Sequence, residues 1–560
     1  MGFFVRFGSV DLFMEFGDWK PRMGRPSANV GFLKALLTFG RYDTYYFFCP
    51  DLHNLKIFRE RLPELIPDPK LQERVQITLQ VALAEIVREQ EFEVFHLGDF
   101  TYSMPQLIAL RNRLARVPFP VTGMTHSIDP IFMNSRYLEL ILAGPAPYDG
   151  IVCSSPGAQE AVEKGLGWVG KHLREMTGVG FPTHLRLELI PVGIEEPLFQ
   201  GENRREARAY FRFPPDAVVV LSLGRISLRH KADWAPALEL FARMESQREL
   251  GKIILIIAGG GQSSDVSLLE SMVNQMGLGK RVLLFPNFAP EIKQKLYQAS
   301  DFYLSITDNF QETFGLTVLE AMASGLPVVI SDFSGYRDFI SHGREGFLIP
   351  TTWAESMPEF LKENMGILDP SMARLYLSQM VAVDLERLKA AILRLARDEK
   401  LRFRMGGAAK SKALTYRWSN VIPAYERFWG ELKEESRHYA LNPIEPPNIL
   451  AGDFSSTFSH YPSRRLSGKE EIRLTDYGTQ ILKDSAKPIR YEDVQVCLFP
   501  DLEKLLLNSL LEQPRSVANL REMSRKSLEA TKGQVDFILL WLLKHGAVKI
   551  ESPWLTLEVD

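Results

Sequence analysis

The chain has 560 residues, which is too long for one hydrophobic core, so we expect two or three domains. Its apolar fraction of 45%, aromatic fraction of 11% and charged fraction of 24% are ordinary for a folded protein and exclude a largely disordered chain. The formal net charge of −3 gives no support to nucleic-acid binding by the protein as a whole.

Three cysteines are widely spaced along the chain: Cys49, Cys153 and Cys497. They form neither a metal-ligand pattern nor a disulfide framework, which suits a reducing cytosol. The segment Met1–Val10 is apolar but is interrupted by Arg6 and has no charged leader, so it predicts a first β-strand and not a signal peptide. The longest apolar runs, such as Ile253–Ala258, are too short to span a bilayer. We therefore expect a cytoplasmic protein, either soluble or peripheral at the inner membrane face.

Short apolar runs alternate with segments of helical periodicity through most of the chain. The first series of predicted strands is Tyr45–Cys49, Glu93–Leu97, Val121–Thr125, Gly150–Cys153 and Leu187–Val192. The second series is Val218–Leu223, Lys252–Ala258, Arg281–Phe285, Phe302–Ile306, Pro327–Ile330 and Gly346–Ile349. Segments such as Asn29–Leu37 and Leu71–Val87 have the period of a helix. Apolar strands that alternate with helices imply parallel sheets covered on both faces, so the fold class is α/β with two doubly wound, Rossmann-like domains.

Pro and Gly residues that interrupt the regular pattern indicate where these domains end. A strand ends in the Pro/Gly-containing segment Ile190–Ile194, and helical patterns resume at Asp384–Arg397, Lys400–Leu414 and Trp418–Leu432. The predicted segments are a Rossmann-like domain over 1–195, a second over 196–414, a crossover helix over 415–437, a linker over 438–469 and an accessory domain over 470–560.

The strongest motif is Gln311–Pro327, QETFGLTVLEAMASGLP, which lies between two predicted strands. Gly315 stands where a loop turns into a helix, and the free N–H groups and dipole of that helix favour a phosphate or sugar oxygen. Glu320 lies on the helix about one turn beyond Leu316, whereas Glu312 stays in the loop. Two carboxylates therefore approach one site from different elements.

This motif closely resembles the family 4 retaining glycosyltransferases. Two glutamates at this interval are a weak signal alone, but the Phe-Gly-Leu, Glu-Ala-Met-Ala and Gly-Leu-Pro sequences around them are specific. In that family the first Glu contacts the donor sugar, the amides after it hold sugar and phosphate, and the second Glu binds the ribose hydroxyls. The resemblance assigns these roles to Glu312, Phe314-Gly315-Leu316 and Glu320. The alternative is a loop acid and a solvated helical glutamate.

A second motif, Leu221–Asp233, opens a hydrophobic strand into a loop that carries Gly224, Arg225 and Lys231. Arg and Lys can neutralise a departing nucleoside diphosphate through charge-assisted hydrogen bonds. The segment resembles the family's diphosphate clamp, which implies that role for Arg225 and Lys231. The spacing is one residue longer than the commonest version, so Arg229 is an alternative to Lys231. A basic surface loop is the competing interpretation.

Two weaker features gain meaning from the resemblance. Gly259 and Gly260 end another predicted strand; a plain tight turn explains them, but they are similar to the family's turn near the nucleotide base. His126 follows the strand Val121–Thr125; a lone histidine there is more often structural, but the family places a His there to contact the donor sugar across the cleft. Two segments depart from the family: Gly24–Ser27 replaces its paired glycines, and Asp338 replaces a Glu.

The resemblance runs from about Pro182 to Leu432 and implies a GT-B fold, in which an acceptor-side domain and a nucleotide-sugar domain face a cleft. It implies a metal-independent, retaining hexosyltransferase with Glu312, His126, Arg225 and Lys231 as the catalytic set, and no cofactor besides the nucleoside-diphosphate sugar. The acceptor is a polysaccharide, a lipid-linked sugar or a small molecule. The alternatives are a nucleotide-sugar epimerase or phosphorylase of the same fold, and a non-catalytic sugar-nucleotide sensor.

The last part of the chain has short helical segments and a terminal strand, Ala547–Ile550, in an order like that of a winged-helix domain. A DNA-binding domain of this kind needs a basic, polar recognition helix, whereas Gln534–Leu543 is apolar on almost every side. We therefore expect a buried helix in a structural or protein-interaction module, with no nucleic-acid partner.

Overall fold

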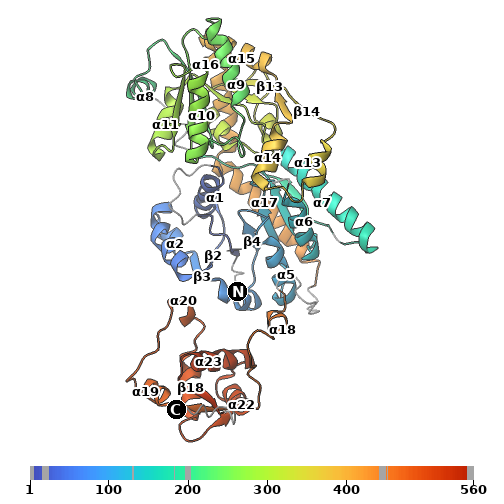
Figure 1. The fold of residues 1–560 in the computed structure, drawn as a ribbon, viewed down its shortest axis with the longest axis vertical. Helices are drawn as coiled ribbons and strands as arrows, with labels where there is room; N and C mark the ends of the chain where they lie inside the picture. Colours follow the sequence, from blue (N-terminus) through green and yellow to red (C-terminus); the bar gives the residue numbers. More distant parts are fainter. Residues whose placement is uncertain are drawn as a thin grey trace, which may run out of the picture. The chain divides into compact units, whose positions relative to one another are not determined.

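The computed structural model describes residues 5–14, 24–128, 131–181, 183–195, 203–440, 450 and 452–551. The chain divides into two compact units, Met1–Leu450 and Ala451–Asp560. The first unit contains two parallel sheets with helices on both sides of each (Figure 1). Part of the predicted linker, 441–449 and 451, lies outside the described residues.

The first sheet has seven parallel strands in the order β3-β2-β1-β4-β5-β6-β7. Its strands are β1 (Arg6–Ser9), β2 (Thr44–Cys49), β3 (Val75–Leu79), β4 (Val94–Leu97), β5 (Val121–Met124), β6 (Gly150–Cys153) and β7 (Arg186–Leu189). Its main helices are α1 (Arg25–Phe39), α2 (Leu52–Leu65), α4 (Leu83–Glu89), α5 (Met104–Leu114), α6 (Met133–Leu142) and α7 (Pro156–Thr177). The strand order reverses between β1 and β4, and in open α/β sheets ligands bind beyond the carboxyl ends of the strands at such a point.

The helix predicted over Leu71–Val87 is wrong in its centre. Val75–Leu79 forms β3, which pairs with β2 at the edge of the sheet, and helical structure begins again only at Gln80. Apolar and polar residues alternate through β3, and this period of two favours a half-buried strand over a helix. This alternation covers only five residues, and the longer segment Leu71–Val87 around it still has the period of a helix.

The second sheet has six parallel strands in the order β10-β9-β8-β11-β12-β13. Its strands are β8 (Val218–Leu223), β9 (Ile253–Gly259), β10 (Val282–Pro286), β11 (Phe302–Ser305), β12 (Val328–Ser331) and β13 (Gly346–Ile349). Its main helices are α9 (Ala235–Ser246), α10 (Ser263–Gln275), α11 (Pro290–Ala299), α12 (Leu316–Ala323), α15 (Leu385–Arg397) and α16 (Glu399–Ala413). The order reverses at the adjacent strands β8 and β11, and both conspicuous motifs start at the carboxyl ends of these two strands.

Helix α17 (Trp418–Ser436) follows the second sheet in sequence but packs against α1 and the first sheet (Figure 1). The fully buried Trp429 donates from Nε1 to Thr122 Oγ1 at 3.1 Å. Lys433 Nζ donates to the carbonyls of Phe92 and Pro118 at 3.0 and 3.1 Å. The chain thus returns to the first domain, and α17 completes that domain's core.

The second unit has a three-stranded antiparallel sheet in the order β17-β16-β18. These strands are β16 (Glu471–Leu474), β17 (Arg515–Ser516) and β18 (Val548–Glu551), and the longer helices are α21 (Pro500–Ser509), α22 (Val517–Leu528) and α23 (Lys532–Lys544). This arrangement is winged-helix-like. Helix α23 is buried on one face only, because Phe537 and Leu540 remain 44% and 52% exposed. No helix in the described parts of the chain is long and apolar enough to cross a membrane.

Candidate active site

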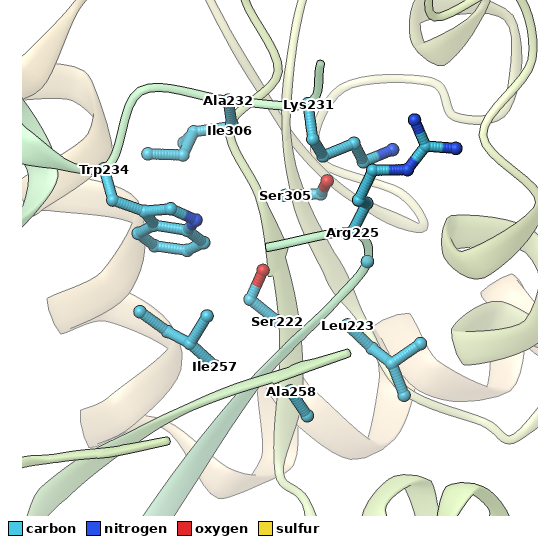
Figure 2. Close-up of a pocket in the computed structure, with 11 residues that line it drawn as sticks. Ser222, Leu223, Arg225, Lys231, Ala232, Trp234, Ile257, Ala258, Ser305 and Ile306 are labelled. Atoms are coloured by element: carbon cyan, nitrogen blue, oxygen red, sulfur yellow. The ribbon is translucent and has the colours of Figure 1, made fainter. Parts of the chain in front are cut away.

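The loop after β8 carries the two cations predicted to bind the diphosphate. The Gly224 N–H donates to Ala258 O at 3.0 Å, which fixes the start of this loop against β9. Arg225 is exposed, and Figure 2 shows that its side chain and that of Lys231 extend to the same side, away from Trp234. The small cavity behind them, of about 10 Å³, has room for about one water molecule. The exposed Arg225 and the partly buried Lys231 therefore lie on the same side of the loop that follows β8.

Lys231 and Glu312, which come from the two motifs, form an ion pair. Lys231 Nζ also donates to the hydroxyl of Tyr336 at 3.0 Å, and that hydroxyl lies 2.9 Å from Ser305 Oγ. Burial lowers the pKa of Lys231, but the charge of Glu312 and the contact with Tyr336 outweigh it, so the net pKa is raised. Lys231 is therefore an ammonium group throughout the physiological range.

Gly315 is the residue before α12, and the backbone there requires glycine. Its φ is 102°, and a Cβ at this position would lie 2.4 Å from Cε1 of Tyr336. The side chain of the preceding Phe314 is buried against Phe339, with ring centroids 4.9 Å apart. This arrangement directs the free N–H groups of the first turn of α12, from Leu316 onward, to the end of the sheet.

Glu320 on α12 is buried, and both of its carboxylate oxygens have donors from α11. Lys293 Nζ lies 2.6 Å from Oε1, and the Tyr297 hydroxyl donates to Oε2 at 2.9 Å. Glu320, Lys293 and Leu316 line a cavity of about 350 Å³, whose opposite wall includes Pro26–Ala28 of α1. A buried carboxylate held this firmly at a cavity wall can accept hydroxyl groups from a ligand without rearranging.

His126 lies directly beside the Glu312 loop. The Thr313 hydroxyl donates to the His126 carbonyl at 2.9 Å, and the Ser155 hydroxyl donates to the Thr313 carbonyl at 2.6 Å. The His126 ring contacts Asn29 Oδ1 through Nε2 at 2.7 Å. Burial, together with the positive charge of Arg25, lowers the pKa of His126 to about 3, so the ring is neutral at physiological pH. The first domain thus places an uncharged imidazole at the cleft.

The remaining predicted residues have backbone roles in the structure. Ile226 N–H donates to the Gly260 carbonyl at 2.7 Å, and Asn287 N–H donates to the Gly259 carbonyl at 2.8 Å. The carbonyls of the two glycines therefore connect the end of β9 to the loops after β8 and β10, and their contact with a nucleotide base stays a prediction. The carbonyl of Arg229 accepts from Asn309, while its guanidinium group is exposed.

Sequence reasoning missed several residues that touch this site: Tyr336, Ser305, Lys293, Tyr297 and Asn309. Tyr336 lies in the turn η3 (Ser334–Asp338), where the sequence drew attention only to Asp338. Lys293 and Tyr297 are four residues apart on α11, which places them on one face of the helix, but nothing local shows that this face meets Glu320. Helix α11, PEIKQKLYQA, is rich in polar residues, so Lys293 does not stand out in the sequence.

Comparison with known proteins shows which family and which folds this chain resembles. Residues 203–370 match the family Glycosyl transferases group 1. A D-inositol 3-phosphate glycosyltransferase of Mycolicibacterium smegmatis is 26% identical over 233 residues, which are 40% of this chain and 51% of the relative. The protein of the same name from Thermobispora bispora is 30% identical over 187 residues, which are 32% of this chain and 43% of the relative. The chain thus spans about half, or less, of the length of these relatives.

Two solved structures are similar over about three quarters of the chain. Sucrose-phosphate synthase (tll1590) from Thermosynechococcus elongatus has a TM-score of 0.52 at 18% identity, covering 77% of this chain and 100% of that one. Anabaena Alr3699/HepE in complex with UDP and glucose has a TM-score of 0.51 at 15% identity, covering 76% and 99%. The fold is therefore GT-B, and the resemblance to GT4-like glycosyltransferases is confirmed.

Proposed function

We propose that this protein is a metal-independent, retaining glycosyltransferase that moves a sugar from a nucleoside-diphosphate sugar to an acceptor hydroxyl. The observation that carries the proposal is the meeting of Lys231, Glu312 and the N-terminus of α12 at the carboxyl ends of β8 and β11. A cation, a carboxylate and free N–H groups at one point match the charges of a sugar diphosphate.

On the diphosphate side, Arg225 and Lys231 neutralise the charge that develops as the bond to the sugar breaks. The diphosphate is already anionic in the donor and gains charge in the transition state, so the two cations both bind the donor and lower the barrier. The Gly315–Leu316 amides add hydrogen bonds to the same oxygens. Because two cationic side chains face the site, the reaction needs no divalent cation to stabilise the leaving group.

On the sugar side, Glu312 orients the donor sugar and stabilises its oxocarbenium-like charge, and the neutral His126 contacts the sugar from the first domain. The bond between the anomeric carbon and the diphosphate oxygen breaks, and the acceptor oxygen bonds to that carbon on the same face. The acceptor proton passes to the departing diphosphate oxygen, so the anomeric configuration is retained and the charges balance. Holding the acceptor hydroxyl next to the anomeric carbon supplies much of the rate enhancement.

Glu320, held by Lys293 and Tyr297, is assigned to the ribose hydroxyls. The UDP and glucose bound to Alr3699/HepE support a nucleotide-sugar donor here, and the names of the relatives support a sugar or polyol acceptor. The acceptor class proposed is a polysaccharide, a lipid-linked sugar or a small molecule. We propose a cytoplasmic protein, peripheral at the membrane if the acceptor is lipid-linked, in which the second unit contacts the acceptor or a protein partner and not nucleic acid.

A panel of radiolabelled UDP-, GDP- and ADP-sugars, each assayed with EDTA and with added Mg²⁺ or Mn²⁺, tests the proposal. We expect release of a nucleoside diphosphate from one donor class, at a rate that EDTA leaves unchanged. Activity that is lost in EDTA and restored by Mn²⁺ would contradict the metal-independent mechanism. Tight binding of a sugar nucleotide with no product, across a broad acceptor set, would favour the non-catalytic sensor.

A further inference from the structure

Three consecutive residues after β11, Thr307–Asn309, hold the loop that carries Lys231. The Thr307 hydroxyl donates to the Lys231 carbonyl at 3.1 Å, and the Asn309 side-chain amide donates to the Arg229 carbonyl at 2.9 Å. Asp308 Oδ2 accepts from the Asp233 N–H at 3.2 Å. Thr307, Asp308 and Asn309 are 0%, 6% and 1% exposed, so these polar groups are shielded from competing water.

Asn309 also holds the turn that carries Glu312. Its Oδ1 accepts from the Gln311 N–H at 3.1 Å, and its carbonyl accepts from the Glu312 N–H at 3.1 Å. The two ends of one side-chain amide therefore bond to different loops, which fixes how that amide is oriented. The loop with the cation and the turn with the carboxylate are joined through a single buried residue.

We propose that Thr307, Asp308 and Asn309 are positioning residues that fix Lys231 and Glu312 at the spacing required to bind a sugar diphosphate. This inference rests on the proposed function. Lys231 lies in a turn outside the helices and strands, where its own N–H donates to the Ser227 carbonyl at 3.0 Å and the nearby Arg225 and Arg229 are exposed. A misplacement of about 1 Å at a reacting centre can cost about 100-fold in rate. The three hydrogen bonds from Thr307–Asn309 add to the bonds within this loop and join it to the turn that carries Glu312.

Isosteric variants remove these bonds one at a time. Thr307→Val deletes the hydroxyl that bonds to Lys231. Asn309→Asp removes the donor to Arg229 but keeps the oxygen that accepts from Gln311. Ser300→Ala is the matched control, because the buried Ser300 hydroxyl bonds to a helical carbonyl, that of Leu296, at 2.6 Å and does not touch either loop.

The first measurement is the binding of UDP by calorimetry, together with kcat and KM for the donor that the panel identifies. We expect Thr307→Val and Asn309→Asp to weaken UDP binding and raise KM about tenfold or more, with Tm shifts no larger than that of Ser300→Ala. UDP affinity and KM within twofold of the wild type in both variants would overturn the proposal. So would equal losses in Ser300→Ala, since these would reflect general destabilisation.

The second measurement is amide hydrogen exchange over residues 229–233 and 309–312 of the free protein, which requires no donor. We expect faster exchange in Thr307→Val and Asn309→Asp than in Ser300→Ala and the wild type; unchanged exchange would overturn the proposal. If the wild type binds no nucleoside diphosphate, the proposed function fails. Faster exchange in that case would still establish that the three residues hold the loop, so the two failures are distinguishable.

Discussion

The ammonium group of Lys231 is bonded to the carboxylate of Glu312, so the group assigned to the diphosphate and the group assigned to the sugar neutralise each other before a donor arrives. A diphosphate offers Lys231 a second anionic partner, and the hydroxyl of Tyr336 bonds to the same ammonium. Either residue alone would leave a partly buried, unpaired charge in the cleft. The ion pair therefore reduces the energetic cost of burying these two charges while no donor is bound.

This pairing predicts that Lys231→Ala is more harmful than the loss of one cation. The variant leaves the Glu312 carboxylate unpaired next to the diphosphate position, so we expect donor affinity to fall about 100-fold. Adding Glu312→Gln to Lys231→Ala should recover part of this affinity, while Glu312→Gln alone should chiefly lower kcat. Calorimetry with the donor nucleotide and initial rates measure these effects. A double variant that binds no better than Lys231→Ala would contradict the coupling.

A second prediction concerns Tyr336. Burial raises the pKa of its phenol, so the hydroxyl stays neutral and can accept from Lys231 while it donates to Ser305 or Glu312. Tyr336→Phe keeps the ring that packs on Gly315 and removes only these bonds. We expect a loss of about 1 kcal/mol in the free energy of unfolding and a larger proportional loss in kcat/KM. Denaturant melts and steady-state rates are the measurements; unchanged kcat/KM would show that Tyr336 serves only the fold.

The third prediction distinguishes the contribution of Lys293 to donor binding from that of Glu320. Glu320→Ala should abolish measurable recognition of the ribose and leave the Lys293 ammonium unpaired. Lys293→Met keeps most of the volume of the side chain but leaves Glu320 with Tyr297 as its one described donor. We expect Lys293→Met to raise KM about tenfold with little change in kcat, because ribose binding is equal in the ground and transition states. A change confined to kcat would place Lys293 at the reacting sugar instead.

Part of this structure could be predicted from the sequence. Gly150–Cys153, Val218–Leu223 and Gly346–Ile349 were predicted with the bounds observed, because buried parallel strands are continuous apolar runs. The half-buried strand Val75–Leu79 lacks such a run and was predicted as helix.

The same distinction applies to the site. The place of Gln311–Pro327 between two strands could be predicted from one continuous motif, and the roles assigned to its residues stay predictions. The partners of its glutamates could not be predicted, because they are distant in sequence: Lys231 and Glu312 are separated by 81 residues, and Lys293 and Glu320 by 27. Only the fold, which brings the ends of β8 and β11 together, determines these contacts.

The fourth prediction is a pH dependence of stability. Burial raises the pKa of Asp308 to about 7, and the nearby Asp233 carboxylate contributes to this shift, whereas the Asp233 N–H opposes it. The folded state therefore holds a proton that the unfolded state releases, so this group's contribution to stability is present at low pH and is lost as pH rises from about 4 to about 7. The difference in free energy of unfolding between the wild type and Asp308→Asn should therefore fall by up to about 4 kcal/mol over this range. Denaturant melts at pH 4.5, 6 and 7.5 measure it; a constant difference would contradict the raised pKa.

The last prediction concerns the second unit, whose hydrophobic core consists of its own residues, from Leu466 to Ile550. Leu450 packs against the core of the first unit, so a protein that ends there keeps that contact. We expect the protein ending at Leu450 to fold and to retain donor turnover within a few-fold of the full chain. A folded but inactive shortened protein would show that the second unit contributes to catalysis.

The same unit should not bind DNA in a mobility-shift assay on residues 452–560. Arg521 donates to both carboxylate oxygens of Asp536, at 2.6 and 2.9 Å, and Arg525 donates to the carboxylate of Glu522. Two of the basic side chains on α22 therefore already have acidic partners. Phosphate contacts depend on cations that are free to displace counterions, and binding through them weakens steeply with salt. The half-exposed Phe537 and Leu540 on α23 suit a protein or acceptor surface instead, because a DNA backbone offers apolar groups no comparable partner. Retardation of DNA at low salt that disappears at higher salt would overturn this assignment.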